Sequence, residues 1–498
     1  MVLVQGFKNR YGRKVNKIVN YSEIQQLRKE YGISQTKLAE YSGLSKSKIA
    51  SFELGKSAPS EKEVSCLKKV LEDLIERIKL GELNLKGHRV VSTVKKEVIS
   101  KQQIPIKDRE DYKKRTCEMT YNGEYPKELS KLYHKAQENN EKSIKAIGLF
   151  SGCGGLDFGF KAAGVNFVGH IEIWDAANRI YSENFPNVKL LKTDINDVTN
   201  DDIQNWISEF GTIDIIVGGP PCQGFSLAGK RDSGDLRNQL YKQYVRIVRD
   251  IHPKVFVFEN VAKLTSMKNK SGELFLNEIL QSFADVGYTL KYKILNACNY
   301  GVPQSRERVI LVGVRTDLNV QFEFPVEKYV KIDDLEQLNL FDVQKPLRTF
   351  QDAMEGLESL ENGERSKDDP LHWAIVHPEH VINWLKDVPE GKSAHDNDDP
   401  QKRPPSGFNT TYKRNTWKEP CSTISTNFNM ISGCRNVHPT NTRSLTIREA
   451  ARAQSFPDEF VFCGKWGDIR AVIGNAVPPL LAHSIAEEII NQVFKGEI

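Results

Sequence analysis

Residues 144–156, IKAIGLFSGCGGL, decide the fold of the longer part of this chain. The apolar run 144–150 predicts a buried strand, and the glycines after it predict a tight turn into a helix. Glycines at such a turn let the backbone approach a ligand, and the first turn of the next helix offers free N–H groups. The spacing fits a nucleoside or an amino-acid ligand no worse than a dinucleotide.

Strand-like runs recur downstream, at residues 167–171, 188–195, 213–217, 255–258 and 309–314, with helical patterns between them. This alternation predicts an α/β fold in which helices flank a mostly parallel sheet. In sheets of this kind, ligands bind outside the carboxyl ends of the strands. The ends of these runs are therefore the places to look for chemistry.

Two acids follow the second and third strands. Glu172 comes directly after the run 167–171, and Asp194 with Ile195 ends the run 188–195. A carboxylate in this place can accept hydrogen bonds from ribose hydroxyls. Taken singly, each acid is more often a solvated strand end, but two of them beside a glycine turn favour a nucleoside cofactor.

A cysteine stands behind two prolines in residues 218–226, GGPPCQGFS. The prolines stiffen the loop after the strand 213–217, so Cys222 is expected at the edge of the sheet. Glu259 follows the next strand and can face the same cleft. A thiolate can add to an electrophile that a carboxylic acid protonates, so the pair indicates covalent catalysis with acid assistance. On this segment alone, a small buried core residue is an equal alternative.

The bulk composition excludes several classes of protein. The chain has 498 residues, 39% of them apolar and 27% charged, and its length predicts about two to four domains. No apolar stretch approaches the ~18 residues of a membrane span, and the N-terminus lacks the apolar segment of a signal peptide. The eight cysteines form no CxxC pair, so neither a zinc site nor a disulfide framework is expected, and no metal is predicted.

Charge is distributed unevenly along the chain. Residues 1–145 hold 31 Lys and Arg against 19 Asp and Glu, although the whole chain is only at +5. This asymmetry predicts a basic N-terminal module that faces a polyanion. The alternative is that the excess lysines only keep a segment in solution.

Residues 21–56 read YSEIQQLRKEYGISQTKLAEYSGLSKSKIASFELGK. Apolar positions at helical spacing, serines at two helix starts and a glycine turn predict three short helices. The stretch resembles the repressor type of helix-turn-helix, with residues 45–54 as the recognition helix. By that resemblance the residues expected at DNA are Gln35, Thr36, Lys46, Ser47, Lys48 and Ser51. A three-helix dimerisation module is the alternative, and a further predicted helix at 61–80 either completes the module or pairs two copies.

The longer part contains eight motifs in one order: FSGCGG, the acid Glu172, TDI, GGPPCQGFS, ENV, QSRER, RSLTIREAARAQSFP and GNAVPP. This set resembles the DNA (cytosine-5) methyltransferase family from residue 144 to the end of the chain. The resemblance implies a Rossmann-like, S-adenosylmethionine-dependent methyltransferase domain interrupted by an irregular target-recognition insertion. The expected domains are an all-α helix-turn-helix domain at 1–80, a partly helical linker at 81–143, the catalytic domain at 144–315 and 443–498, and the insertion at 316–442.

The resemblance names S-adenosylmethionine as the cofactor. Glu172 is implied at the ribose, Asp194 at the adenine amino group and Ile173 against the adenine face. Ile173 stands where some family members have an aromatic residue, so the packing there is expected to be aliphatic. The full implied set is Phe150, Gly152, Leu156, Glu172, Ile173, Asp194, Ile195, Pro220, Leu240, Asn475 and Val477.

The resemblance also implies the reaction. The Cys222 thiolate adds to C6 of cytosine while Glu259 protonates or hydrogen-bonds N3, and C5 of the resulting enamine takes the methyl group. Arg308 is expected at the O2 side of the base, and Arg306 is expected to brace the cysteine loop. Loss of the C5 proton and β-elimination then release the enzyme.

A duplex hides C6 in the base stack, so the target cytosine must be flipped into the site. By the resemblance, residues 223–237 form a loop that closes over it, and Thr423-Ile424 match a Thr-aliphatic pair of the insertion. The insertion's Arg403, Lys413 and Arg414 are further expected groove contacts. Together with the residues of the N-terminal domain, the expected DNA-binding set is Gln223, Ser226, Lys230, Arg231, Thr423 and Ile424.

The implied partner is double-stranded DNA, and the implied role is the modification methylase of a type II restriction-modification system in a bacterial cytoplasm, at the nucleoid. The cognate restriction endonuclease is then a functional partner. The monomer is expected to methylate, while the N-terminal domain represses its own promoter, dimerises or adds non-specific DNA affinity. Two other functions stay open: a transcription regulator with a vestigial methylase, against which the complete motif set argues, and a tRNA cytosine-5 methyltransferase, against which the long insertion argues.

Overall fold

The chain forms two compact units, Met1–Gln102 and Gln103–Ile498, in the computed structural model. The structure describes residues 7–8, 14–15, 21–31, 33–42, 44–54, 57, 59–79, 103–104, 123–138, 144–221, 240–269, 272–331, 344–405 and 408–495. No helix in these ranges is long and apolar enough to cross a membrane. Each unit has its own hydrophobic core.

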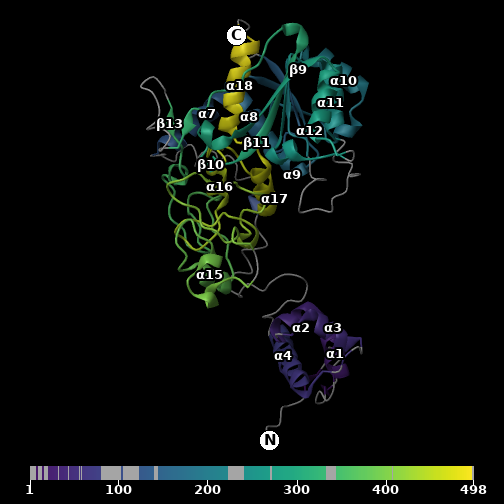
Figure 1. Cartoon of the computed structure of the whole chain (residues 1–498), viewed down its shortest axis with the longest axis vertical. Helices are drawn as coiled ribbons and strands as arrows, with labels where there is room; N and C mark the ends of the chain where they lie inside the picture. The colour runs from purple at the N-terminus through teal and green to yellow at the C-terminus, as the bar shows by residue number, and fades with distance from the viewer. Residues whose placement is uncertain are drawn as a thin grey trace. The chain divides into compact units, whose positions relative to one another are not determined.

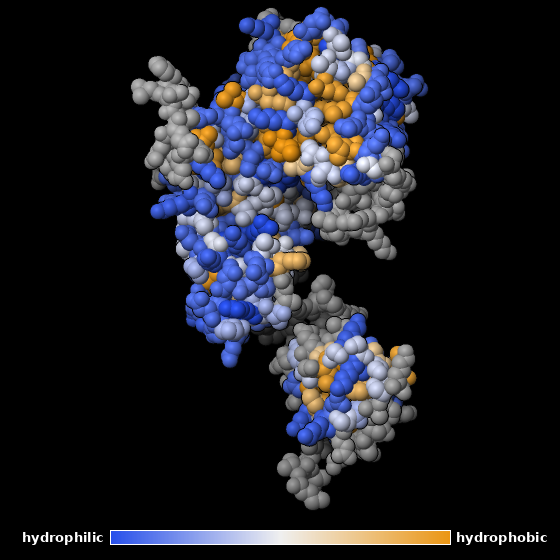
Figure 2. Space-filling model, viewed as in Figure 1, coloured by the Kyte–Doolittle hydropathy of each residue, from blue (hydrophilic) through white to orange (hydrophobic). Residues whose placement is uncertain are grey.

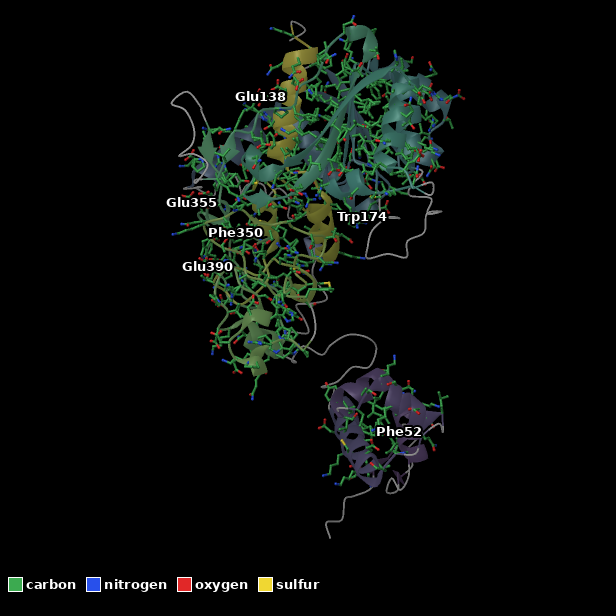
Figure 3. All side chains as sticks on the ribbon, viewed as in Figure 1. Phe52, Glu138, Trp174, Phe350, Glu355 and Glu390 are labelled. Atoms are coloured by element: carbon green, nitrogen blue, oxygen red, sulfur yellow. The ribbon has the colours of Figure 1, made fainter. Side chains whose placement is uncertain are left out.

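The N-terminal unit is a small helical bundle. Its elements are β1 (Phe7–Lys8), β2 (Lys14–Val15), α1 (Tyr21–Glu30), α2 (Gln35–Ser42), α3 (Lys46–Glu53) and α4 (Glu61–Lys79). Ser45 caps α3 by accepting a hydrogen bond from the backbone N–H of Lys48, as a serine at a helix start is expected to do. Phe52, labelled in Figure 3, is buried with Leu38 and Leu71 between the helices. The predicted helices are confirmed.

A seven-stranded sheet organises the second unit. Its strand order is β6-β5-β4-β7-β8-β11-β9, and β6, β5, β4, β7 and β8 run parallel while β11 is antiparallel to both of its neighbours. The bounds are β4 (Lys145–Leu149), β5 (Asn166–Ile171), β6 (Lys189–Lys192), β7 (Ile215–Gly218), β8 (Val255–Val261), β9 (Tyr288–Asn296) and β11 (Glu307–Arg315). The mostly parallel sheet expected from the sequence is confirmed.

Side chains alternate across this sheet because successive residues of a strand point to opposite faces. Ile215 and Val217 of β7 lie in one core, whereas Ile216 lies in the other. Helices cover both faces: Figure 1 shows α8 (Gly155–Ala162) and α18 (Pro479–Val493) on one side of the strands, and α10 (Asn200–Phe210), α11 (Leu240–Ile251) and α12 (Phe275–Ala284) on the other. The α9 helix (Asp175–Asn184) contributes to the same core as α8.

Segments far apart in the sequence complete the catalytic half. The α18 helix packs along α8, and α7 (Glu124–Gln137) packs against α8 as well. Tyr125, on α7, is fully buried and donates a hydrogen bond to the carbonyl of Arg452 at 2.9 Å. The second unit therefore extends into the stretch expected as a linker, because α7 belongs to its core.

The insertion contains little regular structure. It includes β12 (Tyr329–Val330), β13 (Lys345–Pro346), α14 (Phe350–Met354), α15 (Glu379–Leu385) and β14 (Cys421–Ser422), the last paired with β10 (Gln304–Ser305). Figure 2 shows mainly hydrophilic residues over this part, whereas apolar residues gather over the part that holds the sheet. A small core around Leu385, Tyr412 and Val437 holds it together.

Buried ion pairs attach the insertion to α16 (Ile447–Ala453). Arg448 of α16 pairs with Asp369 of the insertion and with Asp458. Arg443, directly after the insertion, forms a two-pronged pair with Glu449 of α16, and all these side chains are at most 3% exposed. Burial alone would raise the pKa of Glu449, but the Arg443 guanidinium holds it well below its ordinary value. The segment after the insertion, which leads through α16 to β15 (Gly464–Lys465) and α17 (Trp466–Asn475), rejoins the catalytic core. Ion pairs as well as apolar packing hold it in place.

Arg414 corrects one expectation for the insertion. The sequence suggested a groove contact, but the residue is 2% exposed and donates to the carbonyls of Leu385, His438 and Asn441. An arginine whose donors are turned inward cannot reach DNA in this conformation. Its charge serves the fold of the insertion instead.

Candidate active site

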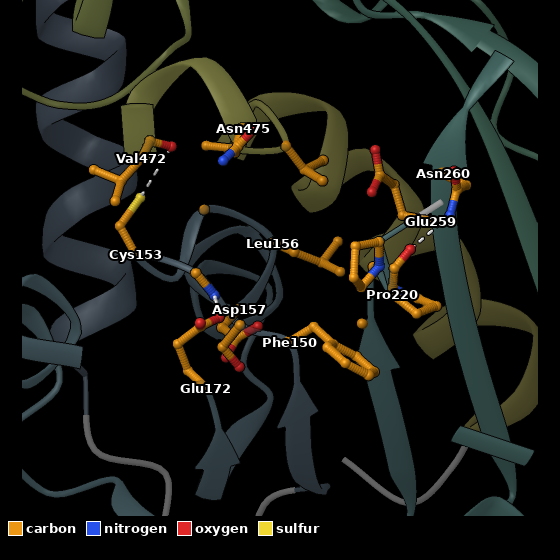
Figure 4. A pocket seen from close by; sticks show the side chains of 18 of the residues that line it. Phe150, Cys153, Leu156, Asp157, Glu172, Pro220, Glu259, Asn260, Val472 and Asn475 are labelled. Atoms are coloured by element: carbon orange, nitrogen blue, oxygen red, sulfur yellow. Dashed lines mark hydrogen bonds between the residues drawn. The ribbon is translucent and has the colours of Figure 1, made fainter. Parts of the chain in front are cut away.

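A cavity of about 320 Å³ opens at the carboxyl ends of β4, β5, β7 and β8. This is the edge where parallel α/β sheets bind ligands. Figure 4 shows its two sides: Glu172 and Asp157 lie together on one, and Pro220, Glu259 and Asn260 lie on the other. The lining also includes Phe150, Ser151, Gly152, Cys153, Gly155, Leu156, Ile173, Trp174, Gly218, Gly219, Pro221, Val261, Arg308, Val472, Asn475, Ala476 and Val477.

The glycine turn shapes the first side. Phe150, Gly152 and Gly154 all have positive φ, at 55°, 57° and 90°. A Cβ on Gly152 would have no other atom within 4 Å, whereas a Cβ on Gly155 would lie 2.5 Å from the carbonyl oxygen of Val477. The turn therefore presents bare backbone to the cavity and lets the α17–α18 connection close against it.

Glu172 holds this turn in place. Its carboxylate accepts hydrogen bonds from the backbone N–H groups of Gly152 and Trp174, each at 2.8 Å. Burial raises the pKa of Glu172, and the two backbone hydrogen bonds act in the opposite direction. Each carboxylate oxygen keeps a second lone pair that can accept a hydrogen bond from a ligand.

Glu259 and Arg308 form the polar group of the second side. Nε of Arg308 lies 2.8 Å from Oε1 of Glu259, and the two side chains are 13% and 12% exposed. The antiparallel pairing of β11 with β8 brings them together, since Arg308 lies opposite Val261. Burial raises the pKa of Glu259, and Arg308 followed by Arg306 opposes this effect. A carboxyl in this setting can hold a proton for a ligand and stabilise the charge that remains.

Asn260 anchors the proline loop. Its side-chain amide donates to the carbonyl of Pro220 at 2.8 Å, and its oxygen accepts from the N–H of Val261 at 2.9 Å. Gly219 packs so closely on Glu259 that a Cβ there would lie 2.6 Å from Oε2. The backbone that leads to residue 222 is thereby fixed against the buried acid.

Arg306 is fully buried and ties distant segments together. Its two terminal nitrogens donate to the carbonyl of Ile424 at 3.0 Å and to that of Gly474 at 2.8 Å. It thus links the insertion to the end of α17, whose last residue, Asn475, lines the cavity. Cys222, which Arg306 was expected to brace, lies outside the described residues.

The structure brings most of the expected cofactor residues to one cavity. Its lining includes Phe150, Gly152, Leu156, Glu172, Ile173, Pro220, Asn475 and Val477, together with Glu259 and Arg308. Asp194, Ile195 and Leu240 lie outside this lining. Asp194 accepts from the N–H of Asn196 in a 3-10 turn (Ile195–Asp197), and Ile195 is buried in the core.

Several lining residues were not expected from the sequence. Asp157, Trp174 and Val472 all face the cavity. Asp157 is the third residue of α8, where an acid is usually read as a favourable charge at an exposed helix start. Asp157 is buried because α8 packs against α9. The sequence around Asp157 does not predict this contact.

The residues expected to contact DNA differ in how exposed they are, and four of them lie outside the described residues. Lys46, Ser47 and Lys48 are exposed on α3, and Ser51 is half-buried. Gln35 donates to Glu53, which also pairs with Arg28, and Thr36 lies in the first turn of α2. In the second unit, Gln223, Ser226, Lys230 and Arg231 lie outside the described residues.

Of the two expected residues in the insertion, Thr423 and Ile424, one is exposed and the other is buried. Thr423 is exposed and donates to the carbonyl of Ser305 at 2.7 Å. Ile424 is fully buried, and its N–H donates to Gln304. Its side chain supports the core. Within the described ranges, no group of three or more His, Cys, Asp or Glu residues could hold a metal ion.

Two family models match the chain. Residues 144–491 match "C-5 cytosine-specific DNA methylase", and residues 24–71 match "Helix-turn-helix". The first match covers the sheet, the cavity and the insertion. The second covers most of the four-helix bundle.

Individual proteins agree with this division. The type II methyltransferase M.DdeI of Desulfomicrobium norvegicum is 36% identical over 388 residues, which cover 70% of this chain and 88% of that protein. The type II methyltransferase M.Sau96I of Staphylococcus aureus is 30% identical over 481 residues, covering 94% of this chain and 97% of that protein. A solved structure from E. coli, assigned as a prophage DNA modification methyltransferase, is 25% identical with a TM-score of 0.54, and the match covers 71% of this chain and all of that one.

Proposed function

The chain belongs to the C-5 cytosine-specific DNA methylase family and is a DNA (cytosine-5)-methyltransferase, and we propose that it acts through a covalent Cys222 adduct of a flipped cytosine. The observation that carries the proposal is the pairing of Glu259 with Arg308, 2.8 Å apart at the cavity. The anchored loop Gly219-Pro220-Pro221 leads from there to the cysteine. The proposal requires the thiol of Cys222, which lies outside the described residues, to act together with this acid.

The cavity fits S-adenosylmethionine as the methyl donor. Gly152 leaves bare backbone toward the ligand, Glu172 keeps lone pairs for ribose hydroxyls, and Ile173 is 64% exposed, so it offers an apolar face for a base. When bound, this cofactor supplies an electrophilic methyl group on a sulfonium. Phe150, Leu156, Asn475 and Val477 would enclose it.

Cytosine C5 is a weak nucleophile, so the enzyme must raise its electron density. Addition of the Cys222 thiolate to C6 does this, provided that N3 is protonated or hydrogen-bonded at the same time. Glu259 suits that task because burial raises its pKa, which favours the protonated form more than at an exposed glutamate. Arg308 holds the carboxyl in place and balances its charge once the proton has left.

The proposed order of bond changes is that of a conjugate addition followed by an elimination. The sulfur–C6 bond would form as N3 takes the proton of Glu259. C5 would then take the methyl group of the bound donor, whose sulfonium would become a neutral thioether, and a base would remove the C5 proton. The sulfur–C6 bond breaks last, and the thiolate leaves. The target base must leave the duplex to reach the cavity, and residues 223–237 are the proposed cover over it.

The covalent mechanism has a direct genetic test. Expression in a host without its own cytosine methylation, followed by bisulfite sequencing, should show one methylated sequence motif for the wild type. Cys222→Ser should show none, while Cys66→Ser, at an exposed cysteine of the N-terminal unit, should match the wild type. Methylation by Cys222→Ser at the wild-type level would rule the mechanism out.

We further propose that the enzyme is the modification half of a type II restriction-modification system. The supporting observation is that M.DdeI and M.Sau96I are type II methyltransferases, the second matching 94% of this chain. A cognate endonuclease is then a functional partner. Introducing that endonuclease into cells should be lethal without this chain and tolerated with it.

The N-terminal unit is proposed to bind the enzyme's own promoter. The observation behind it is the exposed Lys46-Ser47-Lys48 start of α3, in the helix that enters the major groove in helix-turn-helix proteins. Full-length Lys46→Ala should lose most promoter binding in a gel-shift assay and keep methylation. Equal binding to promoter and random DNA by the wild type would leave only non-specific affinity for this unit.

A further inference from the structure

Asp157 is a buried acid on the cofactor side of the cavity, and no step of the proposed reaction uses it. It is the third residue of α8, it is 1% exposed, and it is among the residues that line the cavity. Figure 4 shows it beside Glu172, on the side opposite Glu259. Two carboxyl groups therefore meet at one end of a cavity proposed to hold a cationic cofactor.

The surroundings of Asp157 fix its position. Its Oδ2 accepts a hydrogen bond from the hydroxyl of Tyr181 at 2.8 Å. Tyr181 is fully buried and stacks on His170, with ring centroids 3.8 Å apart. Below the carboxyl, Gly148 leaves the necessary room, because a Cβ there would lie 2.4 Å from Oδ2. The carboxyl therefore has little freedom to change its orientation.

The ionisable groups around Asp157 are mostly an acid and neutral phenols. Glu172 is a second acid, and Tyr181 and Tyr244 are neutral phenols whose pKa values are raised by burial and then by Asp157 itself. The nearest cation on its own helix is Lys161, one turn away, whose pKa is lowered by burial and raised by Asp157. In the described part of the chain, no Lys or Arg lies within ion-pair distance of Asp157, in contrast to Glu259 with Arg308.

We propose that Asp157 is a counter-charge for the cationic methionine end of S-adenosylmethionine, and that cofactor binding releases the proton from its carboxyl to solvent. This inference rests on the proposed function, which names the cofactor. The ammonium and sulfonium of the methyl donor are the cations that this end of the cavity would then receive. Asp157 acts as a positioning residue for the donor, alongside Glu172.

The proton balance follows from burial. Desolvation raises the pKa of Asp157 to about 7, although the hydroxyl of Tyr181 opposes the shift. Below that pH the free enzyme holds a neutral acid, and a nearby cation favours the ionised form. Because only the ionised fraction binds the cation well, the apparent affinity should rise with pH through this range.

Isothermal titration of the full chain with S-adenosylmethionine tests the coupling without any turnover. The wild type should bind about tenfold more tightly at pH 8 than at pH 6, as expected when a group of pKa near 7 must lose its proton. At pH 7, the binding enthalpy should differ between phosphate and Tris buffers, because a released proton is taken up by the buffer. Methylthioadenosine, which lacks both cationic groups, should bind with no such pH dependence.

Two variants separate the carboxyl from general structure. Asp157→Asn keeps the shape and should bind with less than about twofold change between pH 6 and pH 8. Tyr181→Phe removes the hydrogen bond that favours the ionised form, so the pH at which affinity rises should move upward. A variant that merely unfolds would lose binding at every pH, whereas a shifted midpoint requires an intact site.

The failures are distinguishable. A wild type that binds no S-adenosylmethionine at any pH overturns the proposed cofactor and this inference with it. Binding that is equally tight at pH 6 and pH 8, or a pH dependence that persists in Asp157→Asn or appears with methylthioadenosine, overturns the inference alone. The inference is supported if the affinity for S-adenosylmethionine rises from pH 6 to pH 8 in the wild type but not in Asp157→Asn, and if Tyr181→Phe moves the pH of this rise upward.

Discussion

Two residues with buried carboxyl groups, Glu259 and Asp157, line one cavity from opposite sides. The charged and polar groups next to them differ. Glu259 is paired with Arg308 at 2.8 Å, with Arg306 behind it. Asp157 has the hydroxyl of Tyr181 and a second acid, Glu172. Burial raises the pKa of both, but only Glu259 has a guanidinium to balance its charge.

This difference indicates which side of the cavity serves the target base and which serves the methyl donor. A carboxyl beside an arginine can lose and regain a proton at modest cost, which suits an acid in a reaction cycle. A buried carboxyl without a paired cation is ionised more readily when a ligand brings a positive charge. The Glu259 side is thus suited to the base, and the Asp157 side to the methyl donor.

Among these variants, Glu259→Gln should cause the largest loss of methyl transfer. Removing the acid should lower methyl transfer by about 10²–10⁴-fold, because proton transfer to N3 is lost while the shape is kept. Tritium transfer from S-adenosylmethionine to duplex DNA measures this, and titration should show an unchanged cofactor affinity. A loss of cofactor binding instead of chemistry would contradict the division between the two sides.

Arg308→Met tests the counter-charge of Glu259. Without the guanidinium, the pKa of Glu259 should rise further, and methyl transfer should fall by about 10–100-fold. Breaking a buried pair should also lower the free energy of unfolding by about 3 kcal/mol. In the double variant with Glu259→Gln, most of that stability loss should disappear, because no uncompensated charge is left. Additive losses in chemical denaturation would show that the pair does not act as a unit.

Gly219→Ala probes the contact between the loop and the acid. The new Cβ would lie 2.6 Å from Oε2 of Glu259, so the carboxyl or the loop must move, and methyl transfer should fall by about tenfold. Gly433→Ala is the matched control, because the space around Gly433 is open. Similar rates for the two variants would mean that the loop does not depend on this contact.

Asp157→Asn should change stability in a way that depends on pH. The folded-state pKa of Asp157 is about 7, above its ordinary value, so the wild type loses stability as pH rises from about 4 to 7. The variant should therefore be about 4 kcal/mol more stable than the wild type at pH 8 and equal to it near pH 4. Thermal melting at both pH values, without cofactor, measures the difference. An Asn variant that melts lower at pH 8 would contradict the buried-charge account.

Much of the fold was predictable because it depends on local patterns. The run 144–150 with its glycines marked β4 and the turn into α8, and apolar runs marked β5, β7, β8 and β11. The strand β9, the antiparallel place of β11 and the packing of α7 on α8 were not foreseen. They depend on pairing between segments that carry no signal of their own.

The site divides in the same way. Glu172, Glu259 and Arg308 could be named because motifs place them at strand ends, and all three line the cavity. Asp157 could not, since its burial arises from Tyr181 on another helix and from the room left by Gly148. Ile424, through its match to a family pair, and Arg414, as a groove contact, were expected at DNA, yet both are buried.

The central claim is that the acid at 259 and the thiol at 222 act together on cytosine. The most direct measurement is the intact mass of the protein after incubation with S-adenosylmethionine and a duplex that carries 5-fluorocytosine at the methylated position. Fluorine blocks removal of the C5 substituent, so the wild type should gain the mass of the methylated strand, and Cys222→Ser should gain nothing. A wild type that methylates ordinary cytosine but forms no such adduct would contradict the account.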